Sequence, residues 1–109
     1  MKGDRLGEFE ELTLLAVCAL KAETYGVPVQ RFVEQATGRD VAMGAIYAAL
    51  DRLEDKGYVR SVMGPATPVR GGRSKRLFEA TREGRELLKT LRRTRERIWR
   101  VIEARGGLS

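Results

Sequence analysis

The sequence of 109 residues has no histidine and one cysteine, Cys18. Without histidine, neither a Ser-His catalytic arrangement nor a histidine-containing zinc site can be built, and one thiol cannot supply a cysteine-rich metal site. The fifteen carboxylates leave acid–base chemistry open, but none of them forms a convincing inward-facing pair on an apolar surface. We therefore expect a protein that is not an enzyme and that holds no metal or other cofactor.

Long hydrophobic runs are also missing. The apolar run Leu12–Leu20 is far too short to span a bilayer. The polar start Met1–Gly7 does not resemble a signal peptide. A lone thiol without a disulfide partner suits a reducing compartment. Gly71-Gly72 is the only glycine pair that suggests a phosphate-binding loop, and it lacks the sequence context of one. These features predict a cytoplasmic protein that does not associate with membranes.

Positive charge is abundant and unevenly distributed. The net charge is +6. Residues 1–58 contain 7 Lys/Arg and 10 Asp/Glu, whereas residues 59–109 contain 14 Lys/Arg and 5 Asp/Glu. This asymmetry is typical of a nucleic-acid-binding protein, and the alternative is a solvated basic surface.

Two helices are predicted in the first third of the chain. The first covers Glu8–Leu20 and is apolar nearly all round from Leu12 onward, so we expect it to be buried on several sides. Its apolar residues at helical spacing are Phe9, Leu12, Leu15, Ala16 and Ala19. The second covers about Tyr25–Ala36, with Thr24 as N-cap, Pro28 in the first turn and Gly38 as a left-handed C-cap. Its apolar face consists of Tyr25, Val29, Phe32, Val33 and Ala36.

A third helix, Met43–Lys56, follows a tight connection and is closed by Gly57. Ile46, Leu50 and Leu53 form its core stripe, with Ala49 between them. Two helices joined by a short turn in this way match a helix-turn-helix.

The rest of the sequence, after Gly57, predicts a hairpin and a long last helix. The short segments Tyr58–Val62 and Lys75–Ala80 are rich in strand-forming residues, and the connector between them is rich in glycine and proline. Thr81 caps a helix that runs to about Ala104. Its apolar residues step by 4, 3, 4 and 3, which is a heptad seam of Leu87, Leu91, Thr94, Ile98 and Val101. Leu88, Trp99 and Ile102 widen it.

The expected fold is therefore mainly α (α+β): a winged helix-turn-helix with a long C-terminal dimerisation helix. Residues 1–80 form the DNA-binding domain and residues 81–109 form the dimerisation helix. A helix of about 24 residues is about 36 Å long and overhangs so small a core. Self-association through the seam and its flanking residues would bury the uncovered apolar surface, so we expect a homodimer.

In this arrangement the third helix enters the major groove of double-stranded DNA. Its exposed side carries Gly44, Ala45, Tyr47, Ala48 and Arg52. Small residues allow close approach to base edges, and the Tyr47 hydroxyl can reach a phosphate. The face has no Asn or Gln, so it is a weak code for direct base readout. A half-buried core tyrosine is the alternative for Tyr47.

The hairpin tip is the stronger indication of DNA binding. Between residues 60 and 76 there are five cations and no acidic residue: Arg60, Arg70, Arg73, Lys75 and Arg76. Gly71 and Gly72 allow the backbone to approach phosphates closely. Taken alone, such a run is as often a solvated surface, but its place after a helix-turn-helix favours a DNA-binding wing.

Several stretches resemble the PadR family of transcriptional regulators: Leu6–Leu12, Tyr25–Val27, Gly44–Val59, Gly71–Arg76 and Thr81–Gly84. The resemblance covers nearly the whole chain and implies a dimeric winged-helix repressor of the short branch, without a large C-terminal effector domain. It implies that Tyr25, Tyr47 and the basic wing meet DNA. The start of the recognition helix, Ala42-Met43-Gly44, departs from the Ser-Pro or Ser-x-Gly of many members, and we place Met43 with the DNA-facing residues.

Some short members bind flat aromatic compounds at the dimer interface, against a tryptophan of the last helix. The resemblance therefore implies a possible effector pocket formed by Phe9, Leu12, Leu15 and Trp99. The alternative is that Trp99 is a core residue of the interface.

The sequence thus predicts a sequence-specific DNA-binding transcriptional regulator, a homodimeric repressor that a small aromatic effector relieves. The alternative is a winged-helix adaptor that binds an acidic protein partner and has no specific DNA target. A footprint on the DNA upstream of the gene would separate the two.

Overall fold

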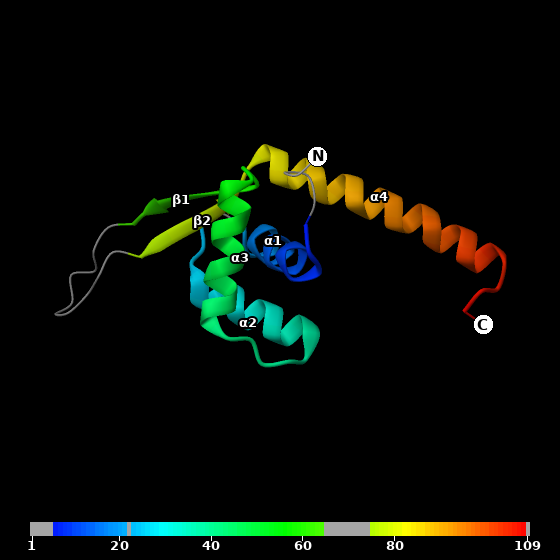
Figure 1. Ribbon diagram of the computed structural model, residues 1–109, viewed down its shortest axis with the longest axis horizontal. Helices are drawn as coiled ribbons and strands as arrows, with labels where there is room; N and C mark the ends of the chain where they lie inside the picture. The colour runs from blue at the N-terminus through cyan, green and yellow to red at the C-terminus, as the bar shows by residue number, and fades with distance from the viewer. Residues whose placement is uncertain (1–5, 22, 65–74, 109) are drawn as a thin grey trace.

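A computed structural model of the chain describes residues 6–21, 23–64 and 75–108. Within these residues, four helices and two strands follow one another (Figure 1). They are α1 (Glu8–Leu20), α2 (Gly26–Thr37), α3 (Met43–Asp55), β1 (Val59–Met63), β2 (Arg76–Ala80) and α4 (Arg82–Ala104). The order and type of every predicted element are confirmed, and the ends differ from the predicted ones by at most one residue.

The two strands form an antiparallel hairpin, the wing, in which Val59 pairs with Ala80 and Met63 with Arg76. Phe78 in the middle of β2 also bridges to Thr24 on its other side, through backbone hydrogen bonds of 2.9 and 2.6 Å. Thr24 was predicted to cap α2, and this was wrong. Its backbone is held in the bridge to Phe78, so Tyr25 takes the N-cap position without a side-chain cap.

The core lies between α1, α2, α3 and the hairpin. Its largest fully buried side chains are Phe78, Leu14, Ile46, Leu50 and Leu53. The predicted core stripe of α3 is therefore confirmed. The predicted stripe of α1 was partly wrong, because Leu15 and Ala19 are exposed and Leu14 and Val17 are buried instead.

The helix ends follow local signals. Gly38 (φ 71°) and Gly57 (φ 84°) have the left-handed conformation expected after α2 and α3. The Thr81 hydroxyl accepts a hydrogen bond of 3.0 Å from the Gly84 N–H, as a capping residue should. On α2, Val29 and Val33 are buried as expected, whereas Phe32 and Ala36 are exposed.

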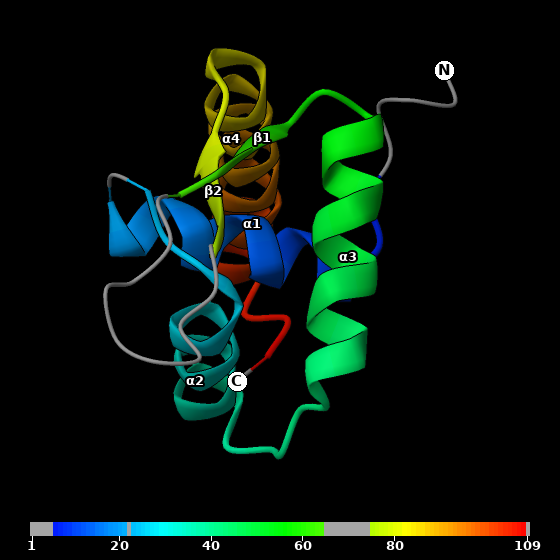
Figure 2. The same ribbon diagram turned by 90° about the vertical axis from the view of Figure 1, so that its left-hand side faces the viewer.

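Helix α4 leaves the body of the molecule and gives it an elongated shape of 61 × 30 × 22 Å. In Figure 1 the wing projects at one end and the last turns of α4 lie at the other. Figure 2 looks onto the wing end and shows α2, α3 and the strands toward the viewer, with α4 running away behind them. Within the described residues, no helix has the length and apolar character needed to cross a membrane.

Candidate nucleic-acid interface

The predicted recognition helix presents the residues expected of it. Gly44, Ala45, Tyr47, Ala48 and Arg52 of α3 are all exposed, and Met43 is half-buried. At 100° per residue, the positions opposite the core stripe are Gly44, Ala48, Asp51 and Asp55. The outer face of α3 is thus small and neutral in its first half and acidic in its second half.

An aromatic cluster lies where the first turns of α2 and α3 meet the base of the wing. The Lys75 ammonium stands 4.1 Å from the centre of the Tyr25 ring. The Tyr47 ring, whose residue is 37% exposed, covers Gly26, and the end of Met43 lies beside it. We call Tyr25, Met43, Tyr47 and Lys75 the tyrosine cluster.

The two helix N-termini beside this cluster have no side-chain cap. Neither Tyr25 nor Ala42 makes a capping hydrogen bond, and neither α2 nor α3 has an acidic residue in its first turn. Free backbone N–H groups and the positive end of the helix dipole favour anions. Two phenols and one ammonium at such helix ends are chemically suited to phosphate groups.

Arg76 at the base of the wing is held by α3. Its guanidinium donates to Asp51 at 2.7 Å and to Glu54 at 2.6 Å, and it lies over the Phe78 ring. Glu54 also accepts hydrogen bonds from the hydroxyl and N–H of Ser61. This network orients the wing relative to α3 and already neutralises one of the cations predicted to contact DNA.

Arg52 is held in the same way by α1. The Glu10 carboxylate accepts from Arg52 Nε at 2.6 Å, from Lys56 Nζ at 2.8 Å and from the Gly7 N–H at 3.2 Å. The Glu10 residue is only 6% exposed. Arg52, one of the residues of α3 predicted to face DNA, therefore packs beside α1, although half of its side chain stays accessible.

The sequence reasoning missed Glu10, Asp51 and Glu54 as residues that organise the site. One signal for Glu10 was available, because it shares a helical face with the buried Thr13 and Val17 at spacings of three and seven. No pattern within the sequence pointed to the contact between Arg76 and α3.

These networks shift the pKa of two carboxyl groups. Burial alone would raise the pKa of Glu10, but the hydrogen bonds from Lys56, Arg52 and Gly7 outweigh it and the pKa falls below 4.5. The pKa of Glu54 is also lowered, chiefly by the Ser61 hydroxyl and, against the effect of burial, by Arg76.

We therefore expect acid to weaken the fold through these groups. A carboxyl whose pKa is lower in the folded state stabilises the protein above its unfolded pKa, and this contribution disappears as the pH falls through and below 4.5. The free energy of unfolding, measured with urea between pH 6 and 3, should decline less steeply in Glu10→Gln and Glu54→Gln than in the wild type. The exposed Glu96→Gln is the control, and equal slopes in all four proteins would contradict this expectation.

The predicted wing extends beyond the residues that the structure describes. Arg70, Gly71, Gly72 and Arg73 lie outside the described residues, so their proposed contact with DNA stays a prediction. Of the other wing cations, Lys75 is in the tyrosine cluster, and Arg60 forms an ion pair with Glu79 on the neighbouring strand.

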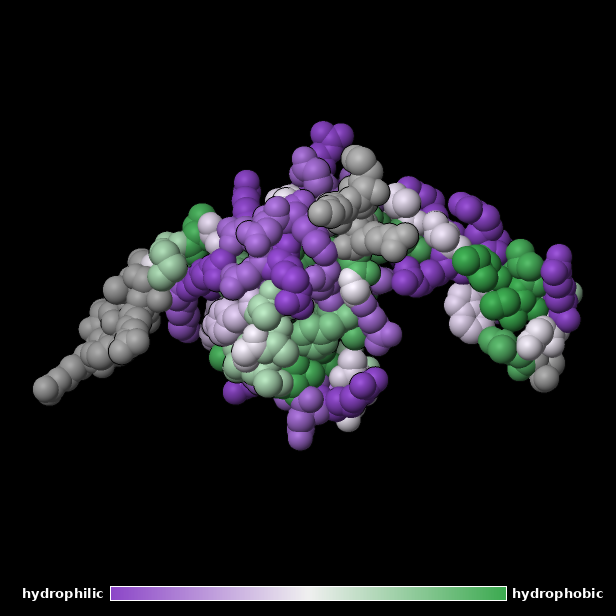
Figure 3. Space-filling view, viewed as in Figure 1, coloured by the Kyte–Doolittle hydropathy of each residue, from purple (hydrophilic) through white to green (hydrophobic). Residues whose placement is uncertain are grey.

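The predicted dimer seam lies along one side of α4. Leu87, Leu88, Leu91 and Ile102 are half-buried. Thr94, Ile98, Trp99 and Val101, farther along the helix, are exposed, Trp99 by 50%. Figure 3 shows the apolar patch at the far end of α4. Exposed apolar residues gathered on a projecting helix are typical of an interface, but the dimer itself stays a prediction.

The four predicted effector-pocket residues divide between two hollows in the single chain. Phe9 and Leu12 line a hollow of about 270 Å³ between α1 and the turn that leads into α3. Leu15 and Trp99 line another of about 230 Å³ between α1 and α4, with Arg92 and Arg95 at its edge. Phe9 and Leu15 are six positions apart on α1, which turns their side chains about 120° from each other.

No three His, Cys, Asp or Glu side chains in the described ranges come together in a way that could hold a metal ion.

Comparison with known proteins shows the family to which the chain belongs. The sequence model of the transcriptional regulator PadR-like family matches residues 14–90, well over half of the chain. The chain belongs to the PadR-like family. Its members are transcriptional regulators rather than enzymes. A comparison with curated protein sequences finds no match.

Solved PadR structures share the fold of this PadR-like chain. A PadR family transcription regulator from Clostridium difficile is 22% identical, with 90% of this chain and 97% of that chain covered and a TM-score of 0.67. A PadR-like transcription factor from Bacteroides fragilis is 18% identical, with coverages of 88% and 86% and a TM-score of 0.70. Bacillus subtilis PadR, solved in complex with operator DNA, is 17% identical, with coverages of 75% and 45% and a TM-score of 0.62.

Proposed function

We propose that this PadR-like protein is a homodimeric repressor that binds operator DNA through α3, the tyrosine cluster and the wing. The observation that carries the proposal is the tyrosine cluster at two uncapped helix N-termini, beside the base of a basic hairpin. All of these groups favour phosphate. The operator complex of Bacillus subtilis PadR, which has the same fold, supports it.

The charges of α3 determine how the helix would lie in the groove. Asp51 and Asp55 on the outer face of its second half are exposed, and phosphates repel them. The first half, with Gly44, Ala45 and Ala48, can approach base edges closely. We infer that the helix enters by its first two turns, so that DNA shape and the spacing of half-sites contribute much of the specificity.

Dimerisation belongs to the same proposal. Two copies joined through the seam of α4 would place two α3 helices against half-sites about 34–36 Å apart. The protein would act in the cytoplasm, where its DNA lies. A flat aromatic effector beside Trp99 would relieve repression. Trp99 is the only tryptophan of the sequence, so quenching of its fluorescence by such a compound would report binding, and unchanged fluorescence would argue against it.

The wing provides the test of DNA binding. A footprint on the DNA upstream of the gene should appear with the wild type and weaken with rising salt. Arg73→Ala combined with Lys75→Ala should lower the affinity at least tenfold and reduce the slope of log affinity against log salt by about 2, since each phosphate contact contributes about 0.9.

Arg60→Ala is the matched control, because Arg60 is paired with Glu79 and should contribute less. If the double variant keeps both affinity and slope, the wing does not contact DNA. If the wild type gives no footprint and binds all DNA weakly, the protein is an adaptor rather than a repressor.

A further inference from the structure

Most of the positive charge of the second half of the chain lies on α4 and not on the wing. Of the 14 Lys/Arg in residues 59–109, nine lie in residues 82–105 and five in the wing. Two of the wing cations, Arg60 and Arg76, are neutralised by carboxylates. DNA binding through the wing therefore leaves the larger part of the charge asymmetry unexplained.

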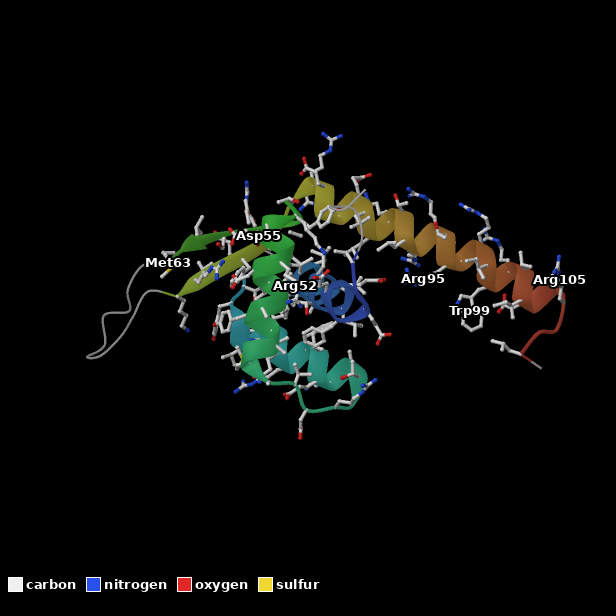
Figure 4. All side chains as sticks on the ribbon, in the orientation of Figure 1. Arg52, Asp55, Met63, Arg95, Trp99 and Arg105 are labelled. Atoms are coloured by element: carbon white, nitrogen blue, oxygen red, sulfur yellow. The ribbon has the colours of Figure 1, made fainter. Side chains whose placement is uncertain are left out.

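The cations of α4 gather on one face. Lys89, Arg93, Arg97 and Arg100 lie within an arc of about 80° at 100° per residue, and this arc is on the side opposite the apolar seam. We call these four residues the α4 stripe. All four are exposed. In Figure 4 nitrogen-tipped side chains stand along the upper side of α4, whereas Trp99 lies on the lower side.

Few carboxylates neutralise this face. Lys89 pairs with Glu86 at 3.2 Å, and Arg93 donates only to the Thr90 hydroxyl. Within the described part of the chain, neither Arg97 nor Arg100 forms an ion pair. The nearby Arg92 and Arg95 are paired with Glu96 and Glu11, whereas three of the four residues of the α4 stripe form no ion pair within the described part of the chain.

We propose that the α4 stripe is a second binding surface for double-stranded DNA, separate from the wing and α3. The stripe runs over the 12 residues from Lys89 to Arg100, which corresponds to a rise of about 16 Å along the helix. Duplex DNA carries one charge per about 1.7 Å of its axis, so each of the four cations can meet a phosphate within this span. A uniform polyanion fits an evenly spaced row of cations that has no apolar residues within it.

The position of the α4 stripe would allow the protein to hold two DNA segments at once. It lies on the arm that projects from the end of the molecule opposite the wing (Figure 1). We therefore expect the duplex that the wing and α3 bind to leave this face free. The stripe also leaves the apolar seam free for a second copy, so a dimer would hold one duplex through its wings and a second segment through α4.

The test uses random-sequence 30-base-pair duplexes and a variant with glutamine at all four positions, K89Q/R93Q/R97Q/R100Q. Glutamine keeps the helix propensity of α4, so the variant should fold. In a background of Arg73→Ala and Lys75→Ala, residual duplex binding should persist with the stripe intact. The glutamine changes should weaken this residual binding further and reduce its salt slope by about 3–4, at about 0.9 per phosphate.

A control variant that removes negative instead of positive charges shows whether the effect depends on charge. Glu86→Gln combined with Glu96→Gln changes the same helix but adds two net positive charges, so it should strengthen residual binding. A second measurement uses protein with an intact wing, bound to an immobilised duplex. The wild-type complex should capture a second duplex from solution. The glutamine variant should keep the footprint and lose this capture.

The outcomes separate this proposal from DNA binding through the wing. If the glutamine variant captures the second duplex as well as the wild type does, the two winged domains bridge the duplexes and the α4 stripe is not a DNA site. If the wing variant loses all duplex binding although the stripe is intact, this proposal also fails. A wild type that gives no footprint but keeps duplex binding through α4 would instead overturn only the proposed operator binding.

Discussion

Gly84→Ala is expected to lower the free energy of unfolding by about 2–3 kcal/mol, although alanine favours helices over glycine by about 1 kcal/mol. Gly84 lies in the first turn of α4, against the backbone of Tyr58. A Cβ at this position would overlap the Tyr58 carbonyl oxygen and lie 3.1 Å from its carbon. Because the obstacle is backbone, α4 itself must move.

That movement would disturb the connection between α4 and the wing. The Thr81 N–H donates to the same Tyr58 carbonyl at 3.0 Å, and the Thr81 hydroxyl donates to the Gly57 carbonyl at 2.7 Å. Thermal melting should show the midpoint lowered by about 10–20 °C.

Gly44→Ala is the control, since no atom lies within 4 Å of the Cβ that it would add. It should leave stability unchanged or raise it by up to about 1 kcal/mol. If both alanine variants melt at the wild-type temperature, the close packing of α4 on Tyr58 is not a determinant of stability.

Gly26→Ala should have one of the largest effects on DNA binding among single changes outside the wing. A Cβ on Gly26 would lie 2.5 Å from the Tyr47 hydroxyl oxygen and 2.9 Å from the end of Met43. Both obstacles are the far ends of side chains, so the fold survives and the tyrosine cluster opens. A hydrogen bond to a charged group contributes about 1.5–3 kcal/mol. Losing the proposed hydrogen bond between the Tyr47 hydroxyl and a DNA phosphate should therefore weaken operator binding by about 10- to 100-fold.

Tyr47→Phe separates the hydroxyl from the ring. It should weaken binding about as much as Gly26→Ala if the phenol contacts phosphate, with an unchanged melting temperature. Binding would be measured by titration at fixed salt, and stability by thermal melting. Wild-type affinity in both variants would show that Tyr47 packs over Gly26 without meeting DNA.

Local patterns explain why the elements could be predicted so closely. Gly38 and Gly57 end α2 and α3 in left-handed conformations, and Thr81 caps α4 through the Gly84 N–H. Each of these signals acts over a few residues and competes with little else. The core stripe of α3 was equally clear, because apolar and polar residues alternate around that helix at the helical period.

In helix α1 the spacing of the apolar residues was not enough to predict which side chains face the core. Apolar side chains surround most of it, so the pattern could not tell that Leu14 faces the core while Leu15 faces the hollow beside α4. Thr24 was misjudged for a related reason. A threonine before a helix is a good cap, and only the presence of Phe78 across from it makes a strand bridge more favourable.

The sequence by itself determined the order of the elements, the uneven charge and the presence of a wing, since these depend on local propensity and composition. The tertiary structure decided which cations remain available. Arg52 and Arg76 were predicted to contact DNA, yet Glu10, Asp51 and Glu54 hold them from positions 22 to 42 residues away in the sequence. Ion pairs between distant residues follow from packing, which places their atoms within a few ångströms, and no local pattern encodes them. In the described part of the chain, the tyrosine cluster at one end of the molecule and the α4 stripe on the projecting arm remain accessible, together with half of the Arg52 side chain.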